Sequence, residues 1–390
     1  MRIAVFHNLP SGGAKRAMAE MIRQLTAAGD TVDVFAPSTA DETFFPSSQA
    51  ATSVTIVEAP TSTVSDRRLR LPRFGQGLRD AAAVQRSIAT TIDAAGYDVA
   101  FVHHCRFVQS PWVLAYLRTP SVYFCQEPYR IVYEARLRPD SRVTRARLWM
   151  PLIGVARIDR TNIAHADRVL ANSAFSRESI LRAYGIDSTV VHLGVDASVF
   201  SPGRPEEKDR YVLAVGAISR FKGHRLVLEA LAQIPESRRP PMLIIGDRTA
   251  GGEVELLRAM ATRSGVTMQI RTLVSDEELV AAYRGASVVA CAAELEPFGL
   301  TALEAAAAGV PVVAIREGGY RETVVDGVTG LLVPDRRPES MASALEQLMA
   351  DTGLRTRLGT AAVERARAEW SWERTGAMAR QHLAAAARSA

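Results

Sequence analysis

Lysine is scarce in this chain of 390 residues. Only three of the 47 basic residues are lysines, namely Lys15, Lys208 and Lys222. Against 42 acidic residues the net charge is +5, an excess too small to indicate nucleic acid as a partner. Each lysine is therefore rare enough to be considered on its own.

Cysteine is also scarce, and long apolar runs are missing. The three cysteines, Cys105, Cys125 and Cys291, are far apart and form no Cys-x-x-Cys pair, which argues against disulfides and a cysteine zinc site. The first apolar run breaks at Asn8, and no apolar stretch of 18 residues follows. We therefore expect no signal peptide, no transmembrane helix and a reducing, cytoplasmic location.

The remaining composition is that of an ordinary globular protein. Hydrophobic residues make up 47% of the chain and charged residues 23%, which excludes disorder and a small stapled fold. Because 390 residues are too many for one hydrophobic core, the length predicts two domains.

Short apolar runs alternate with helical stretches in both halves. In the first half the pattern predicts a helix at 14–29 and strands at 2–8, 30–37, 98–104, 121–127 and 167–173. In the second half it predicts strands at 210–217, 241–247, 287–293, 310–315 and 329–334, and helices at 224–234, 252–264 and 275–286. The last helix opens with a capping box of Ser275 and Glu278.

This alternation is typical of an α/β fold with two doubly wound parallel sheets. The stretch 196–209, rich in Pro, Gly and charge, reads as a linker. We therefore expect Rossmann-like domains at 1–196 and 197–368 that face each other across a cleft. A C-terminal helix within 369–390 should pack back towards the first domain. Ligands of such sheets bind beyond the carboxyl ends of the strands.

Residues 294–304 read ELEPFGLTALE and contain two carboxylates around a predicted helix start. Gly299 falls just before the helix, whose free N–H groups and positive dipole end suit a diphosphate. Glu296 precedes the helix and Glu304 lies about one turn into it, so they could hold diols at opposite ends of a nucleotide sugar. Spacing alone is weak evidence, because two solvated charges would give the same pattern. Glu294 stays unassigned.

Four segments together resemble glycosyltransferase family 4, a group of retaining enzymes with the GT-B fold. They are 296–333, 166–200, 215–224 and 11–37, and they run in the family's order over nearly the whole chain. The resemblance implies metal-independent transfer of a hexosyl unit from a UDP-, GDP- or ADP-sugar, without a cofactor. The first domain would bind the acceptor and the second the donor.

The resemblance also assigns roles around the helix start. Glu304 corresponds to the residue that binds the nucleotide ribose, and Glu296 to the one that contacts the transferred sugar. The backbone amides around Phe298, Gly299 and Leu300 correspond to those that meet the sugar and the diphosphate.

The segment RFKGH (220–224) follows the first strand of the second domain. A cation at that position can neutralise a leaving diphosphate, and the resemblance gives this role to Lys222. Gly216 belongs to the same predicted donor site. The family usually has an arginine directly after this glycine, where this chain has Ala217. Arg220 is the candidate substitute; otherwise it is a solvated loop arginine.

Two further segments of the second domain are candidates. Near Val274 the resemblance places backbone groups that meet the nucleobase. The glycines of GGYRE (318–322) could bring amides to the sugar phosphate, with a simple turn as the alternative.

Candidates in the first domain follow three of its strands. Gly13, in LPSGG, corresponds to a residue that touches the donor phosphate. His104 and Glu127 are candidate catalytic residues, and His103 lies beside them. A structural histidine is the alternative for His104. Many family members carry histidine where this chain has Gln126. Another candidate is Ser173, with helix capping as its alternative.

Arginines concentrate in the first domain. The segment 130–160 holds eight arginines and three acids, and 66–80 holds five arginines and two acids. Both segments include apolar residues, so peripheral contact with an anionic membrane, or with an acceptor phosphate, is one interpretation. An ordinary solvated face is the other.

The sequence therefore predicts a retaining glycosyltransferase acting on a glycan, lipid-linked or small-molecule acceptor. A sugar-nucleotide epimerase and a non-catalytic binding protein of the same fold remain as alternatives. A dinucleotide oxidoreductase is disfavoured, because GGAKRA (12–17) is not a GxGxxG loop. No DxD motif follows a strand at the expected place, so no metal site is predicted.

Overall fold

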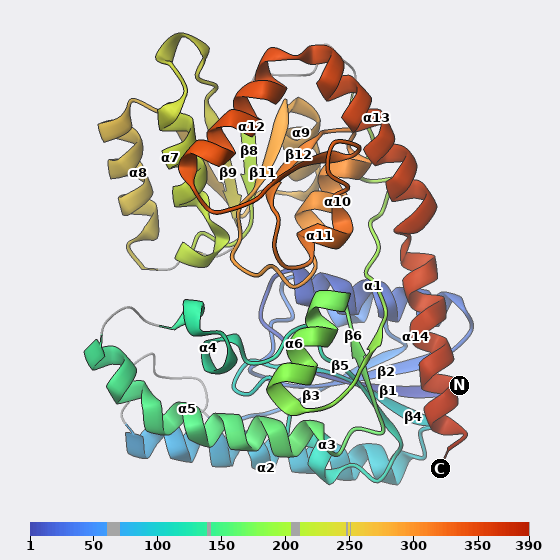
Figure 1. The fold of residues 1–390 in the computed structure, drawn as a ribbon. Helices are drawn as coiled ribbons and strands as arrows, with labels where there is room; N and C mark the ends of the chain where they lie inside the picture. Colours follow the sequence, from blue (N-terminus) through green and yellow to red (C-terminus); the bar gives the residue numbers. More distant parts are fainter. Residues whose placement is uncertain (61–70, 139–141, 204–210, 247–248, 250, 390) are drawn as a thin grey trace. The chain divides into compact units, whose positions relative to one another are not determined.

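The computed structural model describes residues 1–60, 71–138, 142–203, 211–246, 249 and 251–389. The chain divides into two compact units, one formed by Met1–His192 with Glu373–Ala390, the other by Leu193–Trp372 (Figure 1). Each unit contains one parallel sheet with helices packed against it, which confirms the predicted α/β class.

The first unit has seven parallel strands in the order β3-β2-β1-β4-β5-β6-β7. Its central strands are buried on both faces, which explains why they read as continuous apolar runs. The strand order reverses between β1 and β4, and such a point favours ligand binding at the carboxyl ends. The strands are β1 (Arg2–Asn8), β2 (Thr31–Pro37), β3 (Ser53–Val57), β4 (Val99–Cys105), β5 (Ser121–Phe124), β6 (Arg168–Ala171) and β7 (Thr189–Val190).

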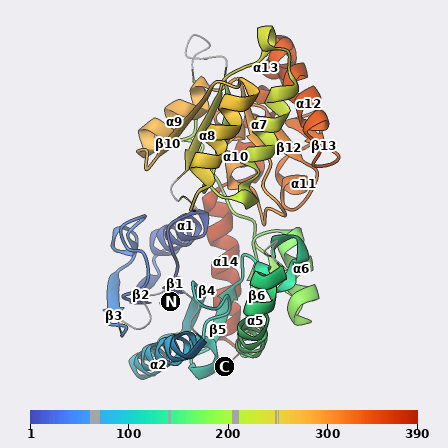
Figure 2. The same ribbon diagram turned by 90° about the vertical axis from the view of Figure 1, so that its left-hand side faces the viewer.

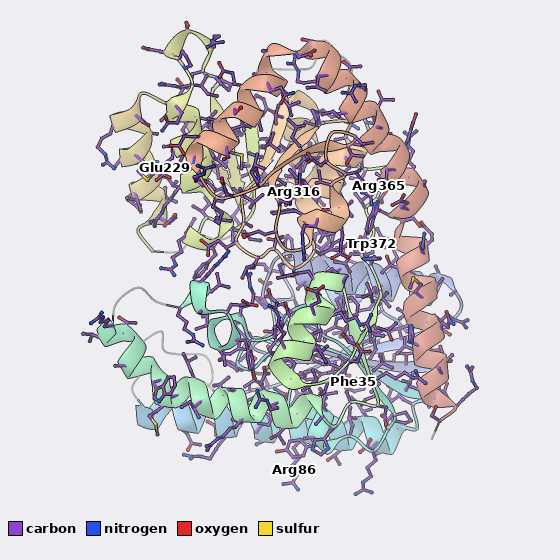
Figure 3. The ribbon with its side chains drawn as sticks, in the orientation of Figure 1. Phe35, Arg86, Glu229, Arg316, Arg365 and Trp372 are labelled. Atoms are coloured by element: carbon purple, nitrogen blue, oxygen red, sulfur yellow. The ribbon has the colours of Figure 1, made fainter. Side chains whose placement is uncertain are left out.

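Helix α1 lies on one face of this sheet and α2 on the other (Figure 2). Helix α1 buries Met18, Met21, Ile22 and Leu25, a stripe at helical spacing. Figure 3 shows the side chain of Arg86 pointing away from the sheet on the exposed side of α2. The helices are α1 (Gly13–Ala27), α2 (Leu71–Ala95), α3 (Val113–Tyr116), α4 (Arg130–Tyr133), α5 (Arg142–Ile163), α6 (Ala174–Tyr184) and α14 (Trp372–Ala387).

The C-terminal helix α14 joins the first unit after the chain has completed the second. The Arg380 guanidinium donates to both carboxylate oxygens of Asp30, at 2.7 and 3.0 Å. Thr375 donates its hydroxyl hydrogen to the carbonyl oxygen of His192 at 2.8 Å. These contacts join α14 to the residue before β2 and to the last residue of the segment Met1–His192.

The second unit has six parallel strands in the order β10-β9-β8-β11-β12-β13. The strands are β8 (Val212–Val215), β9 (Met242–Gly246), β10 (Met268–Thr272), β11 (Val288–Cys291), β12 (Val312–Ile315) and β13 (Gly330–Val333). The helices are α7 (His224–Gln233), α8 (Glu253–Ser264), α9 (Asp276–Gly285), α10 (Leu300–Ala307), α11 (Tyr320–Thr323), α12 (Pro338–Ala350) and α13 (Thr352–Glu369). The predicted capping box at α9 is confirmed, with both hydrogen bonds between Ser275 and Glu278 present.

Three strands were not predicted, namely β3, β7 and β10. Each lies at an edge of its sheet, and most of their residues are at least partly exposed. An edge strand lacks the continuous apolar run that marks a buried one.

Parts of some predicted segments lie outside the described residues. These are 66–70 of the arginine-rich segment 66–80, 139–141 of the arginine-rich segment 130–160, 204–209 of the linker, residues 210 and 247 of two strands, and residue 390.

Candidate functional site

The predicted cation and the first predicted carboxylate are in direct contact in the second unit. Lys222 ends a short 3-10 turn, Arg220–Lys222, that follows β8, and Glu296 lies in the loop between β11 and α10. The ammonium of Lys222 donates a hydrogen bond of 2.8 Å to Oε2 of Glu296. Both side chains keep some exposure, 33% and 16%, so the pair remains accessible to a ligand.

Backbone packing holds this pair together. The amide of Glu294 donates to the carbonyl of Phe221 at 2.8 Å, which joins the loop to the 3-10 turn. A Cβ atom on Gly223 would lie 1.9 Å from the carbonyl oxygen of Ala292, so only glycine fits there. At Gly216 the backbone has a φ of +142°, and a Cβ atom would lie 3.4 Å from Cδ of Lys222. Gly223 thus lets the turn and the loop approach closely.

The second predicted carboxylate, Glu304, is buried inside α10 with only 6% exposure. Its Oε2 accepts a hydrogen bond of 2.6 Å from the hydroxyl of Tyr283, on α9. A buried carboxylate is costly without donors, and this bond both stabilises and orients it.

The start of α10 is free of side-chain capping. Its N-cap is Gly299, with a left-handed φ of +102°, and no side chain of the described residues caps the helix. A Cβ on Gly299 would lie 2.9 Å from the ring of Tyr320. Phe298 is buried, and its ring packs at 5.6 Å against that of Trp370. The amides around Phe298, Gly299 and Leu300 therefore belong to a rigid helix entry of the kind that suits an anion.

The glycine pair after β12 packs against the same loop. The amide of Gly319 donates to the carbonyl oxygen of Glu296 at 2.7 Å. Cβ atoms on Gly318 and Gly319 would lie 2.4 Å from the Glu296 oxygen and 2.5 Å from Phe298 Cα. These contacts favour the turn alternative for Gly319, because its amide is already bonded.

The other candidates of the second unit are more exposed. Val274 is half-buried and follows Leu273, which is 83% exposed and left-handed at φ +54° beyond the end of β10. The guanidinium of Arg220 lies 4.7 Å from the ring centroid of Phe221. The carbonyl oxygen of Ala217, where the resemblance led us to expect arginine, contacts Nε2 of His224 at 3.3 Å.

In the first unit, His104 is buried at the end of β4. Its Nε2 accepts a hydrogen bond of 3.0 Å from the amide of Gln126, so the ring proton is on Nδ1. Nδ1 contacts the side-chain amide of Gln109. Burial lowers the pKa of His104 to about 4. With both nitrogens occupied and the ring neutral, these contacts favour the structural alternative.

Gly13 is the first residue of α1, the element that follows β1. The residue before it, Gly12, has a φ of +127°, which requires glycine.

The remaining candidates of the first unit lie at other strand ends. Glu127 follows β5, is half-buried and forms an ion pair of 3.5 Å with Arg130. His103 is fully buried against the rings of Phe101 and Phe124, and within the described chain neither ring nitrogen has a hydrogen-bond partner. Ser173 caps α6 by accepting from the amide of Ser176 at 2.8 Å, which supports its capping alternative.

The sequence analysis did not predict a buried polar cluster in the first unit, formed by His7, Lys15, Glu42 and Ser47. The ammonium of Lys15, on α1, is fully buried and pairs with the carboxylate of Glu42. The same carboxylate contacts Nε2 of His7 at 2.9 Å, and Lys15 donates to Oγ of Ser47 at 3.1 Å. A signal was present, because Lys15 falls on the apolar face of α1, three residues before Met18.

Within the described ranges no helix is long and apolar enough to cross a membrane. Nor do the described residues contain a group of three or more His, Cys, Asp or Glu side chains that could hold a metal ion.

Comparison with known proteins decides the family. Residues 11–199 match the family described as Glycosyltransferase Family 4, and residues 198–365 match the family described as Glycosyl transferases group 1. A protein of Corynebacterium diphtheriae named D-inositol 3-phosphate glycosyltransferase is 30% identical over 93% of this chain and 87% of its own length. The chain belongs to glycosyltransferase family 4. A relative of the same name from Streptomyces bingchenggensis is 29% identical over 94% of this chain and 83% of its own.

Solved structures support the same fold for this family 4 glycosyltransferase. A sucrose-phosphate synthase from Thermosynechococcus elongatus has a TM-score of 0.77 at 22% identity, covering 98% of this chain and 99% of its own. Anabaena HepE, in complex with UDP and glucose, has a TM-score of 0.75 at 20% identity, covering 99% and 100%. The predicted GT-B fold is therefore confirmed.

Proposed function

We propose that this glycosyltransferase moves a hexosyl unit from a nucleotide-diphosphate sugar to an acceptor hydroxyl. The observation that carries the proposal is the Lys222–Glu296 pair beside the start of α10, with Glu304 one turn inside that helix. Lys222 and the helix amides suit the diphosphate, Glu304 the ribose diol, and Glu296 the hydroxyls of the sugar. Anabaena HepE has been solved with UDP-glucose, so a UDP-sugar is the first donor to test.

We further propose that the anomeric configuration is retained. The bond between the anomeric carbon and the diphosphate oxygen breaks, and the acceptor oxygen bonds to the same face. The acceptor proton passes to an oxygen of the leaving diphosphate. Family membership supports this course. The ion pair supports it too, because the competing route would need Glu296 to attack the anomeric carbon, and a carboxylate bonded to Lys222 is a weaker nucleophile than an unpaired one.

In this scheme the positive charge that neutralises the leaving diphosphate comes from protein groups rather than from a divalent ion. Lys222 neutralises the diphosphate, and the N-terminal end of α10 adds the partial positive charge of its dipole. Transfer should therefore continue in the presence of a chelator. Loss of transfer with chelator, and its recovery on adding Mg²⁺ or Mn²⁺, would refute the metal-free scheme.

For the acceptor we propose a phosphorylated cyclitol, with D-inositol 3-phosphate as the first compound to test. The support is the printed name of the relatives, two of which match this chain over more than nine-tenths of its length. Glycans and lipid-linked acceptors are the competing classes, and the assay should include them.

The test begins with thermal shifts of the wild-type protein in UDP-, GDP-, ADP- and TDP-sugars, because a bound donor stabilises the folded state. Transfer is then followed with the stabilising donor, and proton NMR of the product gives its anomeric configuration. Stabilisation without transfer or donor hydrolysis would indicate a non-catalytic binding protein. Conversion of the donor sugar without an acceptor would indicate an epimerase.

We also propose peripheral contact with an anionic membrane through the first half of α5. Val143, Trp149 and Met150 are 68%, 61% and 72% exposed, and Arg142 beside them is exposed as well. Apolar side chains bordered by arginine suit the headgroup region of a bilayer. The wild-type protein should sediment with anionic liposomes at low salt, and Trp149→Ala/Met150→Ala should not. Equal sedimentation of both proteins would refute this contact.

A further inference from the structure

Arg336, in the loop after β13, holds the chain segment that leads to Glu296. Its guanidinium donates to the carbonyl oxygen of Ala292 at 2.9 Å and to that of Ala293 at 3.4 Å. It also donates to Oε1 of Glu317 at 2.9 Å. One side chain thus fixes two consecutive carbonyls and a carboxylate, a geometry that only the planar fork of arginine provides.

Glu317 extends this contact to the residue before Glu296. Oε1 of Glu317 also accepts a hydrogen bond of 3.1 Å from the amide of Leu295. Leu295 has a φ of +46°, a left-handed conformation that a leucine rarely adopts without support. Glu294, on the other side of Leu295, lies 3.8 Å from Arg336 as an ion pair. The bend that presents Glu296 to Lys222 is therefore held by Arg336 and Glu317.

These contacts are separate from those that orient Glu304. That carboxylate is held by Tyr283 of α9 and by its own helix α10, and neither contact involves Arg336 or Glu317. Removing Arg336 should therefore disturb the Glu296 side of the site and leave the Glu304 side in place.

We propose that Arg336 and Glu317 are positioning residues for Glu296. The proposal rests on the proposed function, in which Glu296 contacts the transferred sugar and Glu304 the nucleotide. It predicts a split between ligands: a nucleotide without its sugar should bind normally to the variants, while use of the whole donor should be impaired.

The experiment compares Arg336→Ala, Arg336→Lys and Glu317→Ala with Arg337→Ala. Arg337 is the matched control, because it is the neighbouring arginine, is 71% exposed and pairs with Asp335. Calorimetry gives the Kd for UDP, and steady-state transfer gives kcat and KM for the donor that the wild type uses. For Arg336→Ala we expect at least a tenfold loss of kcat/KM and a Kd for UDP within twofold of wild type. Arg336→Lys should recover only part of the loss, and Arg337→Ala should match wild type.

Hydrogen exchange without any ligand provides a second readout. Peptides covering 292–299 should exchange faster in Arg336→Ala than in wild type, and those covering α9 should not change. Unchanged exchange, unchanged kcat/KM, or an equal loss of UDP binding and transfer would each overturn the positioning role. A wild-type protein that neither binds nor transfers any donor overturns the proposed function instead. An active wild type with an unaffected Arg336→Ala overturns only this inference.

Discussion

The hydroxyl of Tyr283 donates a 2.6 Å hydrogen bond to Oε2 of Glu304, and both side chains are buried in the second unit. This bond gives the buried carboxylate of Glu304 a hydrogen-bond donor. It also fixes the rotation of the carboxylate before any ligand arrives, which reduces the entropy that binding would otherwise cost.

Weakening this pair should weaken nucleotide binding. For Glu304→Gln we expect the Kd for UDP or GDP to rise about tenfold, or about 1.4 kcal/mol, because a charged acceptor for the ribose diol is lost. Tyr283→Phe should raise the Kd for UDP or GDP less, since the carboxylate of Glu304 remains but is no longer oriented. The control is Tyr211→Phe, whose hydroxyl donates to the carbonyl of Ala282 in the same unit. Wild-type affinity in Glu304→Gln, measured by calorimetry, would refute the ribose assignment.

Lys222 should matter for turnover more than for binding. Removing its ammonium in Lys222→Ala takes away positive charge where the leaving diphosphate gains negative charge, so we expect kcat to fall about 100-fold or more. Arg238→Ala is the control, because that exposed arginine forms an ion pair with Glu346 in the same unit. Steady-state transfer with the preferred donor measures both. A wild-type kcat in Lys222→Ala would show that this lysine does not stabilise the leaving diphosphate.

The elements that the sequence predicted well share a physical property. Buried parallel strands such as β1 and β4 each contain an unbroken apolar run, at 3–6 and at 99–102. The capping box of α9 is a local signal between residues three apart. The Lys222–Glu296 contact could be predicted from the sequence for a different reason. Two short motifs follow neighbouring strands β8 and β11, whose carboxyl ends lie at the same edge of the sheet.

Other features depend on contacts that no local pattern encodes. Glu317 and Arg336 lie 19 residues apart and meet only because β13 returns beside β12. Leucine at position 295 gives no sign of its left-handed backbone, which depends on these two partners. Similarly, Glu42 lies in a loop, and only the folded chain brings it to Lys15 and His7.

The buried cluster of the first unit should make stability depend on acid pH. Burial raises the pKa of Glu42, but hydrogen bonds from His7 and Lys15 outweigh this effect and bring the pKa from 4.5 down to about 2. A carboxyl whose pKa is lower when folded stabilises the fold above pH 4.5, and this contribution is lost as the pH falls from 4.5 towards 2.

We therefore expect Glu42→Gln to lower the melting temperature of the first unit by about 5 °C at pH 7, corresponding to roughly 2 kcal/mol, because Lys15 is left buried without its charged partner. The difference from wild type should persist at pH 5 and shrink towards pH 2. Asp187→Asn is the control, since Asp187 forms an exposed pair with Arg177. Scanning calorimetry across this range measures the effect, and a difference that does not change with pH would contradict the assigned ion pair.

Packing of Gly319 against the loop of Glu296 gives a steric prediction. The backbone of Gly319 is helical, with φ −69°, so alanine would fit its conformation, but the added Cβ would lie 2.5 Å from Phe298 Cα. Because that atom belongs to the backbone, the loop itself must move, at a cost of about 1–3 kcal/mol. Gly319→Ala should therefore lower both the melting temperature of the second unit and the rate of transfer. In Gly251→Ala the Cβ meets no atom within 4 Å, so this control should retain both. Full activity of Gly319→Ala would show that Glu296 tolerates displacement of its loop, contrary to the close positioning inferred from its contacts.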